Sequence, residues 1–111
     1  MKEFLTVNLE KFHKIAPHLD LIDAAIFDYI YHYCASRHEN VITKRNLDGF
    51  TWIDYESLMD NLPYLHINNT TPISRRMDKL EQAGLITRQR EGNQKIFVDV
   101  TPVGTRLYLK P

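Results

Sequence analysis

The sequence predicts an α+β domain that is mainly helical and carries a small antiparallel β-hairpin. Two stretches, 20–36 and about 70–83, repeat apolar residues at the three- and four-residue spacing of an amphipathic helix. Two later stretches, 85–90 and 95–100, alternate apolar and polar residues as strands do, and they flank a turn around Gly92. The chain is long enough for one modest hydrophobic core, so these elements are expected to share a single domain.

Composition and charge limit the classes of protein that this chain can belong to. Apolar residues make up 43% and charged residues 25% of the 111 residues, as in ordinary soluble domains. The formal net charge is zero, but Met1–Asp60 holds six Lys and Arg against ten Asp and Glu, whereas 61–111 holds eight against four. A basic surface on a neutral body is typical of proteins that read DNA sites rather than coat nucleic acid.

We expect a cytoplasmic protein with no membrane partner. Cys34 is the single cysteine, so an intramolecular disulfide is impossible and a reducing compartment is the simplest setting. The charged N-terminal stretch does not have the pattern of a signal peptide, and no stretch approaches the roughly 20 apolar residues of a membrane span.

The stretch NNTTPISRRMDKLEQAGLI contains a helix with well-marked ends. Asn69 or Thr71 can cap its start, because a short side-chain oxygen accepts from the free N–H groups of the first turn. Pro72 fits only in that first turn, and Gly84 can adopt the left-handed conformation that ends a helix.

The two sides of this helix differ in chemistry. The spacing predicts one buried side, formed by Ile73, Met77 and Leu80. The opposite side carries hydrogen-bonding and positively charged groups, namely Thr71, Arg75, Asp78 and Gln82, flanked by Ser74 and Lys79.

The first half of the chain is expected to support this helix. Residues 1–17 form an arm that begins as a strand or extended segment and ends in a helical turn before Pro17. Asp20 caps a scaffold helix over 20–36, whose apolar stripe is Leu21, Ile22, Ala25, Ile26, Tyr29, Ile30 and Tyr33. Residues 37–49 form a loop or an irregular hairpin with a brief strand at Val41 and Ile42.

The remaining elements follow from the same rules. A short strand is expected over 50–53, and a helix from Asp54 or Tyr55 to near Pro63 buries Tyr55, Leu58, Met59 and Leu62. Residues 63–68 then form a turn. After the hairpin, with Ile86, Ile96, Val98 and Val100 pointing inward, Thr101-Pro102 opens a last short helix.

This order of elements resembles the winged helix-turn-helix domains of bacterial and phage DNA-binding proteins. The segments LPYL, ISRRMDKLEQAGLI and KIFVDVTPVG carry the resemblance, which covers about residues 19–107 and is closest to phage and plasmid replication proteins and MarR-type regulators. It implies a three-helix core, a recognition helix at about 70–83 and a β-hairpin wing at 86–100.

The resemblance implies a non-enzymatic protein that binds double-stranded DNA, as a transcriptional regulator or a replication-associated protein. Arg75 and Lys79 are candidate contacts in the major groove, and Arg76 is either a phosphate contact or a salt-bridge partner. Asp78 is expected to orient Arg75 or Arg76 or to accept from a cytosine amine. We expect the charges of the wing to converge on one side of the hairpin and to contact the DNA backbone. The candidate DNA-binding residues are Asn69, Thr70, Thr71, Ser74, Arg75, Arg76, Lys79, Arg88, Arg90, Gln94 and Lys95.

Several alternatives are weaker or stay open. His32, Cys34 and His38 lack the spacing of a metal site, no motif of an enzyme is present, and no cofactor is expected. Clustered tyrosines could stack on single-stranded bases or belong to the core, and Tyr31 could belong to a dimer surface. A homodimer is expected. The alternative function is a protein–protein assembly module of a replication-initiation protein, within which this chain is a fragment or works with a replication or regulatory partner.

Overall fold

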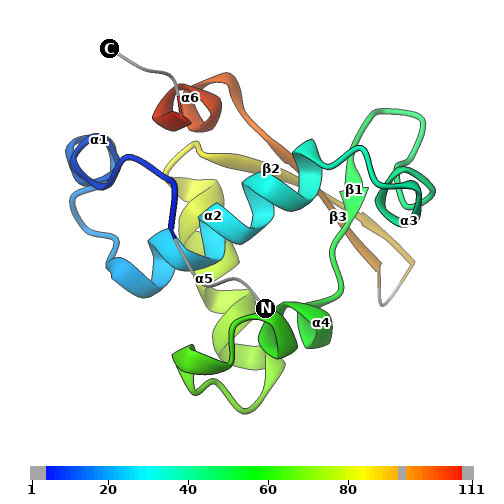
Figure 1. The fold of residues 1–111 in the computed structure, drawn as a ribbon, viewed down its shortest axis with the longest axis horizontal. Helices are drawn as coiled ribbons and strands as arrows, with labels where there is room; N and C mark the ends of the chain where they lie inside the picture. Colours follow the sequence, from blue (N-terminus) through cyan, green and yellow to red (C-terminus); the bar gives the residue numbers. More distant parts are fainter. Residues whose placement is uncertain (1–4, 93–94, 109–111) are drawn as a thin grey trace.

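Six α-helices and a three-stranded antiparallel sheet make up the computed structural model, which describes residues 5–92 and 95–108 (Figure 1). The helices are α1 (Leu9–Ile15), α2 (Leu21–Ala35), α3 (Glu39–Ile42), α4 (Tyr55–Asn61), α5 (Thr70–Gln82) and α6 (Pro102–Thr105). Two 3₁₀ turns, η1 (Pro63–Leu65) and η2 (Arg106–Tyr108), follow α4 and α6. The strands are β1 (Thr51–Trp52), β2 (Ile86–Glu91) and β3 (Lys95–Val100). The predicted α+β class, mostly helical, is confirmed.

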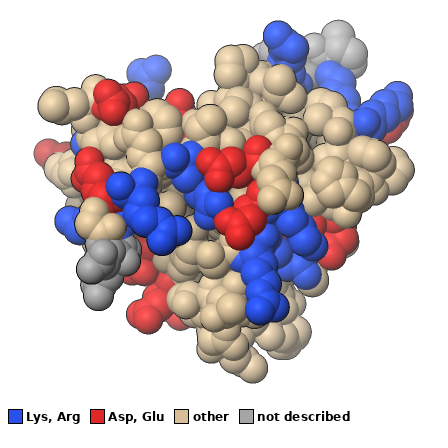
Figure 2. Space-filling model, turned by 180° about the vertical axis from the view of Figure 1, so that it is seen from behind, with Lys and Arg blue, Asp and Glu red and all other residues tan. Residues whose placement is uncertain are grey.

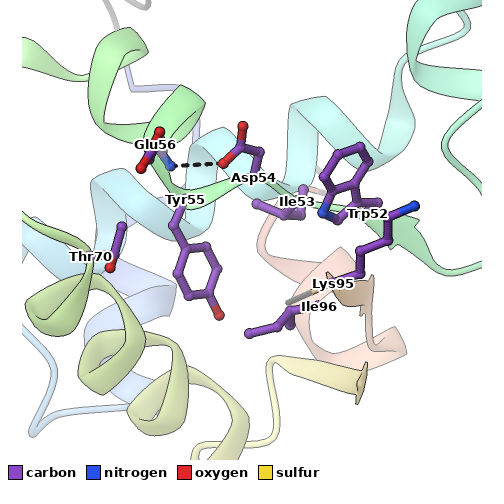
Figure 3. A pocket seen from close by; sticks show the side chains of 8 residues that line it. All are labelled: Trp52, Ile53, Asp54, Tyr55, Glu56, Thr70, Lys95 and Ile96. Atoms are coloured by element: carbon purple, nitrogen blue, oxygen red, sulfur yellow. Dashed lines mark hydrogen bonds between the residues drawn. The ribbon is translucent and has the colours of Figure 1, made fainter. Parts of the chain in front are cut away.

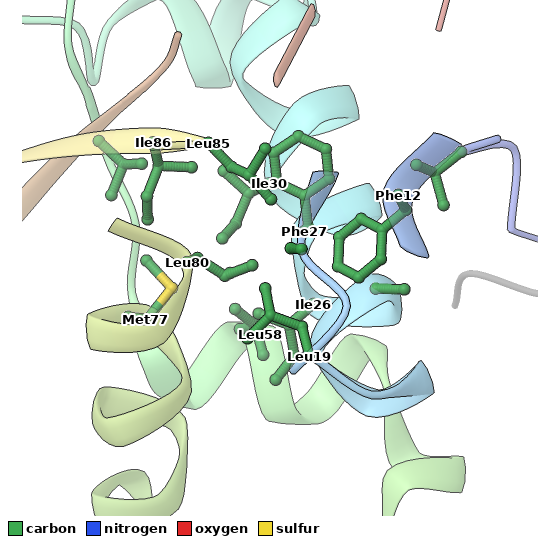
Figure 4. Packing of buried hydrophobic residues seen from close by; sticks show 14 of the residues in the cluster. Phe12, Leu19, Ile26, Phe27, Ile30, Leu58, Met77, Leu80, Leu85 and Ile86 are labelled. Carbon is green, nitrogen blue, oxygen red and sulfur yellow. The ribbon is translucent and has the colours of Figure 1, made fainter. Parts of the chain in front are cut away.

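Helix α2 is the scaffold of the core and crosses in front of α5 in the view of Figure 1. Asp20 caps it through a reciprocal pair of hydrogen bonds, in which its side chain accepts from the Asp23 N–H and the Asp23 side chain accepts from the Asp20 N–H. Its buried face includes Ile26, Phe27 and Ile30, which pack with residues of α4, α5 and β2 (Figure 4).

The apolar stripe predicted for α2 includes one exposed residue, Leu21, and omits two buried ones, Ala24 and Phe27. Leu21 is 63% exposed, whereas Phe27 is fully buried. Phe27 is covered because α1 and the C-terminal turn also pack on this helix: its ring centroid lies 6.2 Å from that of Phe12 and 6.1 Å from that of Tyr108. The prediction assumed that α2 buries only one face. Because neighbouring segments also cover other faces of α2, it missed the residues buried there.

The sheet has the order β1-β3-β2, and its register decides which side chains point toward the core. Thr51 and Arg88 both lie opposite Val98, so these three residues share one face, and Trp52 and Gln89 share the other face with Phe97. The inward positions Ile86 and Val98 are fully buried, as predicted, while Ile96 and Val100 are half-buried against the same core.

Helices α4 and α5 are connected by η1 and a short turn, and each has a side-chain cap. Asp54 caps α4, and of the two predicted caps for α5 it is Asn69 that accepts from the Thr71 N–H. His66 has a φ of 55° in the connecting turn, and Gly84 ends α5 with a φ of 79°. Within α5, Ile73, Met77 and Leu80 are fully buried, which confirms the predicted apolar side.

Two segments differ from the sequence expectations. Glu39–Ile42 is the helix α3 and not a strand, because His38 caps it by accepting from the Asn40 N–H and only Val41 is buried. The arm contains a full two-turn helix, α1, whose start is capped by Asn8. None of the helices within 5–92 and 95–108 has both the length and the apolar composition of a membrane-spanning segment.

Candidate nucleic-acid interface

The outer side of α5 carries two positively charged residues one turn apart. Arg75 and Lys79 are exposed, and neither forms an ion pair with any residue in 5–92 or 95–108. Thr71 and Gln82 are exposed on the same side, opposite the buried Ile73, Met77 and Leu80. This side of α5 therefore offers a ligand one guanidinium group, one ammonium group and several hydrogen-bonding groups.

The predicted contacts at the start of α5 have different surroundings. Asn69 uses its side-chain oxygen to accept from the Thr71 N–H at 3.1 Å, so its amide nitrogen is the part left for a ligand. Thr70 is exposed and lines a groove that also contacts β1 and β3, and Ser74 is half-buried.

Arg76 points away from Arg75 and joins α5 to the start of α2. Its guanidinium donates to Asp20 at 2.8 Å and to the buried Asp23 at 2.9 Å. Partial burial alone would lower the pKa of Arg76, but the hydrogen bonds to these two carboxylates raise it. Of the two roles left open by the sequence, the structure therefore favours the salt-bridge partner.

Arg88 does not line an exposed wing, because its side chain folds back onto α5 and is only 14% exposed. Its guanidinium donates to Glu81 from Nε at 3.0 Å and from Nη2 at 2.9 Å, and it also donates to Asp78. Partial burial alone would lower the pKa of Arg88, but these carboxylates raise it. Asp78, expected to orient Arg75 or Arg76, thus binds Arg88 instead.

The charges of the hairpin do not converge on one side. Arg90 lies opposite Ile96, whereas Lys95 lies opposite Glu91. Successive side chains of a strand point to opposite faces, so Arg88 and Arg90 share one face and Lys95 lies on the other. Arg90 is exposed and makes no ion pair with the described residues. Gln94, also expected at the wing, lies outside the described residues.

Lys95 lies instead beside Trp52, an aromatic residue that the sequence analysis did not single out. The Lys95 ammonium is 5.0 Å from the centroid of the Trp52 ring, and the Lys44 ammonium is 5.7 Å from it. A groove of about 680 Å³ runs from Trp52 and Lys95 to Thr70, with Tyr55 and Ile96 between them (Figure 3). The outward position of Trp52 in a short strand, after the basic pair Lys44-Arg45, is the signal that could have identified it.

Positive and negative side chains are interspersed on the face that Figure 2 shows. Lys and Arg lie next to Asp and Glu across this face, and neither sign forms a large patch of its own. Binding of DNA to this face would therefore depend on a few exposed positive residues and not on a broad positive field.

The other side chains considered for binding or catalysis interact with neighbouring residues of the fold. The Cys34 thiol donates to the Val98 carbonyl at 3.7 Å, and burial raises its pKa to about 12, which keeps it in the unreactive protonated form. Tyr31 stacks on Tyr108 with ring centroids 3.5 Å apart, so one face of its ring is covered within the chain. No three His, Cys, Asp or Glu side chains gather at a possible metal site in the described part of the chain.

Thr6, Asp28 and His32 lie together but do not form a proton relay. The same His32 nitrogen, Nε2, contacts both the Thr6 hydroxyl and the Asp28 carboxylate. A relay needs the acid and the nucleophile on different ring nitrogens. This cluster is therefore a structural hydrogen-bond group between the arm and α2.

No family model, curated protein or solved structure matches this chain. The geometry of the described residues is therefore the basis for inferring a function.

Proposed function

We propose that this chain is a winged helix-turn-helix protein that binds duplex DNA without catalysis, with α5 as its recognition helix. The observation that carries the proposal is the exposed pair Arg75 and Lys79, on the side of α5 opposite its buried residues. A helix of 13 residues is about 20 Å long, and the major groove is wide enough to admit one. The hairpin β2–β3 that follows α5 takes the place of the wing.

The positive residues divide into two groups under this proposal. Arg75 reads a base edge, since its planar guanidinium can bind guanine through two hydrogen bonds, while Lys79 and the exposed Arg90 neutralise phosphates. Arg76 and Arg88 hold α5 against α2 and β2, because their guanidinium groups are already bound to carboxylates. Thr71, Ser74 and the amide of Asn69 supply polar contacts near the start of the helix.

The decisive experiment compares Arg75→Ala with Arg37→Ala in titrations of a selected duplex site. Both arginines are exposed, and both substitutions remove one positive charge, but Arg37 lies outside α5 and the hairpin. Arg75→Ala should weaken binding by about 1–3 kcal/mol and relax the preference for one base pair, whereas Arg37→Ala should have little effect. A folded Arg75→Ala, Lys79→Ala double variant with unchanged affinity would exclude α5 as the reader.

The biological role within this proposal is either that of a transcriptional regulator or that of a replication-associated protein. A regulator that reads palindromic sites would be a homodimer, with one α5 in each half-site. Self-association in solution and a preference for two half-sites about one helical turn apart would favour the regulator.

A second candidate is a protein–protein assembly module of a replication-initiation protein. Exposed apolar side chains on α1, α2 and α6 favour it, namely Leu9, Ile15, Leu21 and Val103. So does the mixture of charges in Figure 2, since a face with both signs suits a protein partner better than a phosphate backbone. Failure to bind any duplex at low salt, where phosphate contacts are strongest, would favour this candidate.

A further inference from the structure

We propose that Trp52, with Lys44 and Lys95, forms a second nucleic-acid site that takes an unpaired strand. A base stacks on the indole, and the neighbouring phosphate binds the two ammonium groups. The site lies at the edge of the sheet and not on the outer side of α5, so it goes beyond duplex binding and does not depend on it.

The position of the indole is set by backbone hydrogen bonds on both sides of it. Trp52 lies opposite Phe97 in the sheet, on the face that Lys95 also shares. The backbone N–H of Trp52 donates to the Lys44 carbonyl at 3.1 Å, and the backbone N–H of Ile53 donates to the Ile96 carbonyl at 3.0 Å. The backbone at Trp52 is therefore held between the α3–β1 connection and β3, with one lysine from each near the indole ring.

Trp52 and Lys95 line two grooves, and the charges of these grooves differ. The smaller groove, of about 340 Å³, has Lys44, Arg45 and Lys95 against one acid, Glu91. The larger groove, shown in Figure 3, has Lys95 against Asp54 and Glu56. A phosphate is favoured in the smaller groove, while the acidic side of the larger groove repels it.

The chemistry of the site favours an unpaired strand over a duplex. Inside a duplex both faces of a base are covered by its neighbours, whereas an unpaired base offers its face to an aromatic ring. An indole with two ammonium groups over its ring brings together the aromatic surface and the phosphate contacts that sequence-independent single-strand sites combine. An acidic peptide such as oligoglutamate would bind the lysines but has no flat ring to stack on the indole. Its binding is therefore the alternative outcome of the test.

The test uses the fact that Trp52 is the only tryptophan in the chain, so the intrinsic tryptophan fluorescence reports on this site alone. The wild-type protein is titrated with an oligothymidylate of about eight nucleotides, which is within the range that stacking sites occupy. Thymidine monophosphate, a fully paired duplex and an oligoglutamate serve as the other ligands. We expect the oligothymidylate to quench the fluorescence at lower concentration than any of these three. An equal or stronger response to one of them, or no response to the oligothymidylate, overturns the proposal.

Matched lysine variants distinguish this site from the duplex-binding side of α5. Lys44→Ala and Lys95→Ala should each weaken oligothymidylate binding and lower the slope of log affinity against log salt by about 0.7. Lys79→Ala removes the same charge from α5 and should leave oligothymidylate binding unchanged. Equal effects of all three substitutions would mean general charge attraction and would overturn the site. Lys79→Ala is expected to weaken duplex binding and not oligothymidylate binding. Loss of its effect on the duplex would count against the duplex proposal, whereas loss of the Lys44→Ala and Lys95→Ala effects on the oligothymidylate would count against the Trp52 site.

A last variant tests the stacking itself. Trp52→Leu keeps an apolar side chain but removes the ring, and the anisotropy of a labelled oligothymidylate then measures binding. We expect the affinity to fall by about tenfold. Thermal melting followed by circular dichroism checks that the variant folds, and if it does not fold the two lysine variants decide. A folded Trp52→Leu protein with unchanged affinity overturns the proposal.

Discussion

Neighbouring residues of the same type have different roles in this protein. Arg75 and Arg76 are adjacent in α5, yet Arg75 faces outward and Arg76 binds Asp20 and Asp23. Arg88 and Arg90 are two apart in β2 and share a face, yet Arg88 binds Glu81 and Arg90 is exposed. Helical and strand periods show which residues share a face. They do not show which acid from a distant segment lies beside each arginine, and so the partners of Arg76 and Arg88 were not predicted from the sequence.

The two arginines of β2 provide a matched pair for testing this division. Arg88→Ala removes a largely buried guanidinium that donates to Asp78 and Glu81, and it leaves Glu81 with only the backbone N–H of residue 88. The free energy of unfolding should therefore fall by about 2 kcal/mol. Arg90→Ala should change it by no more than about 0.5 kcal/mol, because that side chain is exposed. Urea unfolding at neutral pH measures both.

Duplex binding should respond to the same pair in the opposite order. Arg90→Ala should weaken binding to specific and random duplex alike and flatten the salt dependence by about one unit of slope. In the urea experiment, an Arg88→Ala variant as stable as the wild type would show that the ion pairs of Arg88 do not hold β2 to α5. If Arg90→Ala removed discrimination between sequences instead, Arg90 would be a base reader.

Helix ends were the features of the elements that the sequence predicted best. Asp20, Asn69, Gly84 and Thr101 have the end-marking roles expected of them, because capping depends on residues within a few positions of one another. The segment at 39–42 was predicted poorly, since two apolar residues fit a short strand or one helical turn equally well. The groove beside Trp52 was missed because its walls come from three separate segments.

The start of α2 allows capping to be separated from charge. Asp20→Asn keeps a capping oxygen but loses the negative charge beside Arg76, whereas Asp20→Ala loses both. Asp20→Ala should therefore be the less stable of the two, by about 1 kcal/mol at neutral pH. Thermal melts of both variants beside the wild type measure the difference.

The acid dependence of stability gives a further check on Asp20. Partial burial alone would raise its pKa, but the hydrogen bond from the Asp23 N–H and the Arg76 guanidinium hold it below its ordinary value of 3.8. A lowered pKa stabilises the folded state above the pKa of the unfolded chain, and this contribution disappears as the pH falls through the folded-state value. The stability gap between wild type and Asp20→Asn should therefore narrow below pH 3.8. A gap that stays constant there would show that the charge of Asp20 does not contribute.

At the scale of the whole molecule, α1 and the C-terminal turn lie together against α2. The Asn8 N–H donates to the Leu107 carbonyl at 3.1 Å, and Leu107 is fully buried. Leu9 and Val103, close to this contact, are nevertheless exposed. Two further apolar residues near the chain ends, Phe4 and Leu109, lie outside the described residues.

We expect the chain to self-associate through this region. Glutamate at Leu9 or Val103 should shift the protein toward monomer, because a charge cannot be buried in an apolar contact without a large cost. Leu47→Glu is the control, since Leu47 is fully exposed in a distant loop. Sedimentation velocity over a range of concentrations measures the outcome. A wild type that stays monomeric at the highest concentration would exclude the homodimer and favour the assembly module.

The buried carboxylate of Asp28 holds both ends of the described chain. It accepts from the backbone N–H and the hydroxyl of Thr6, and from the hydroxyl of Tyr108, 80 positions away, at 2.7 Å. Neither end can open without removing a hydrogen-bond donor from an acid in the middle of α2. Fraying of the two ends is thus coupled to α2, and native-state hydrogen exchange should reveal them as one cooperative unit with its amides.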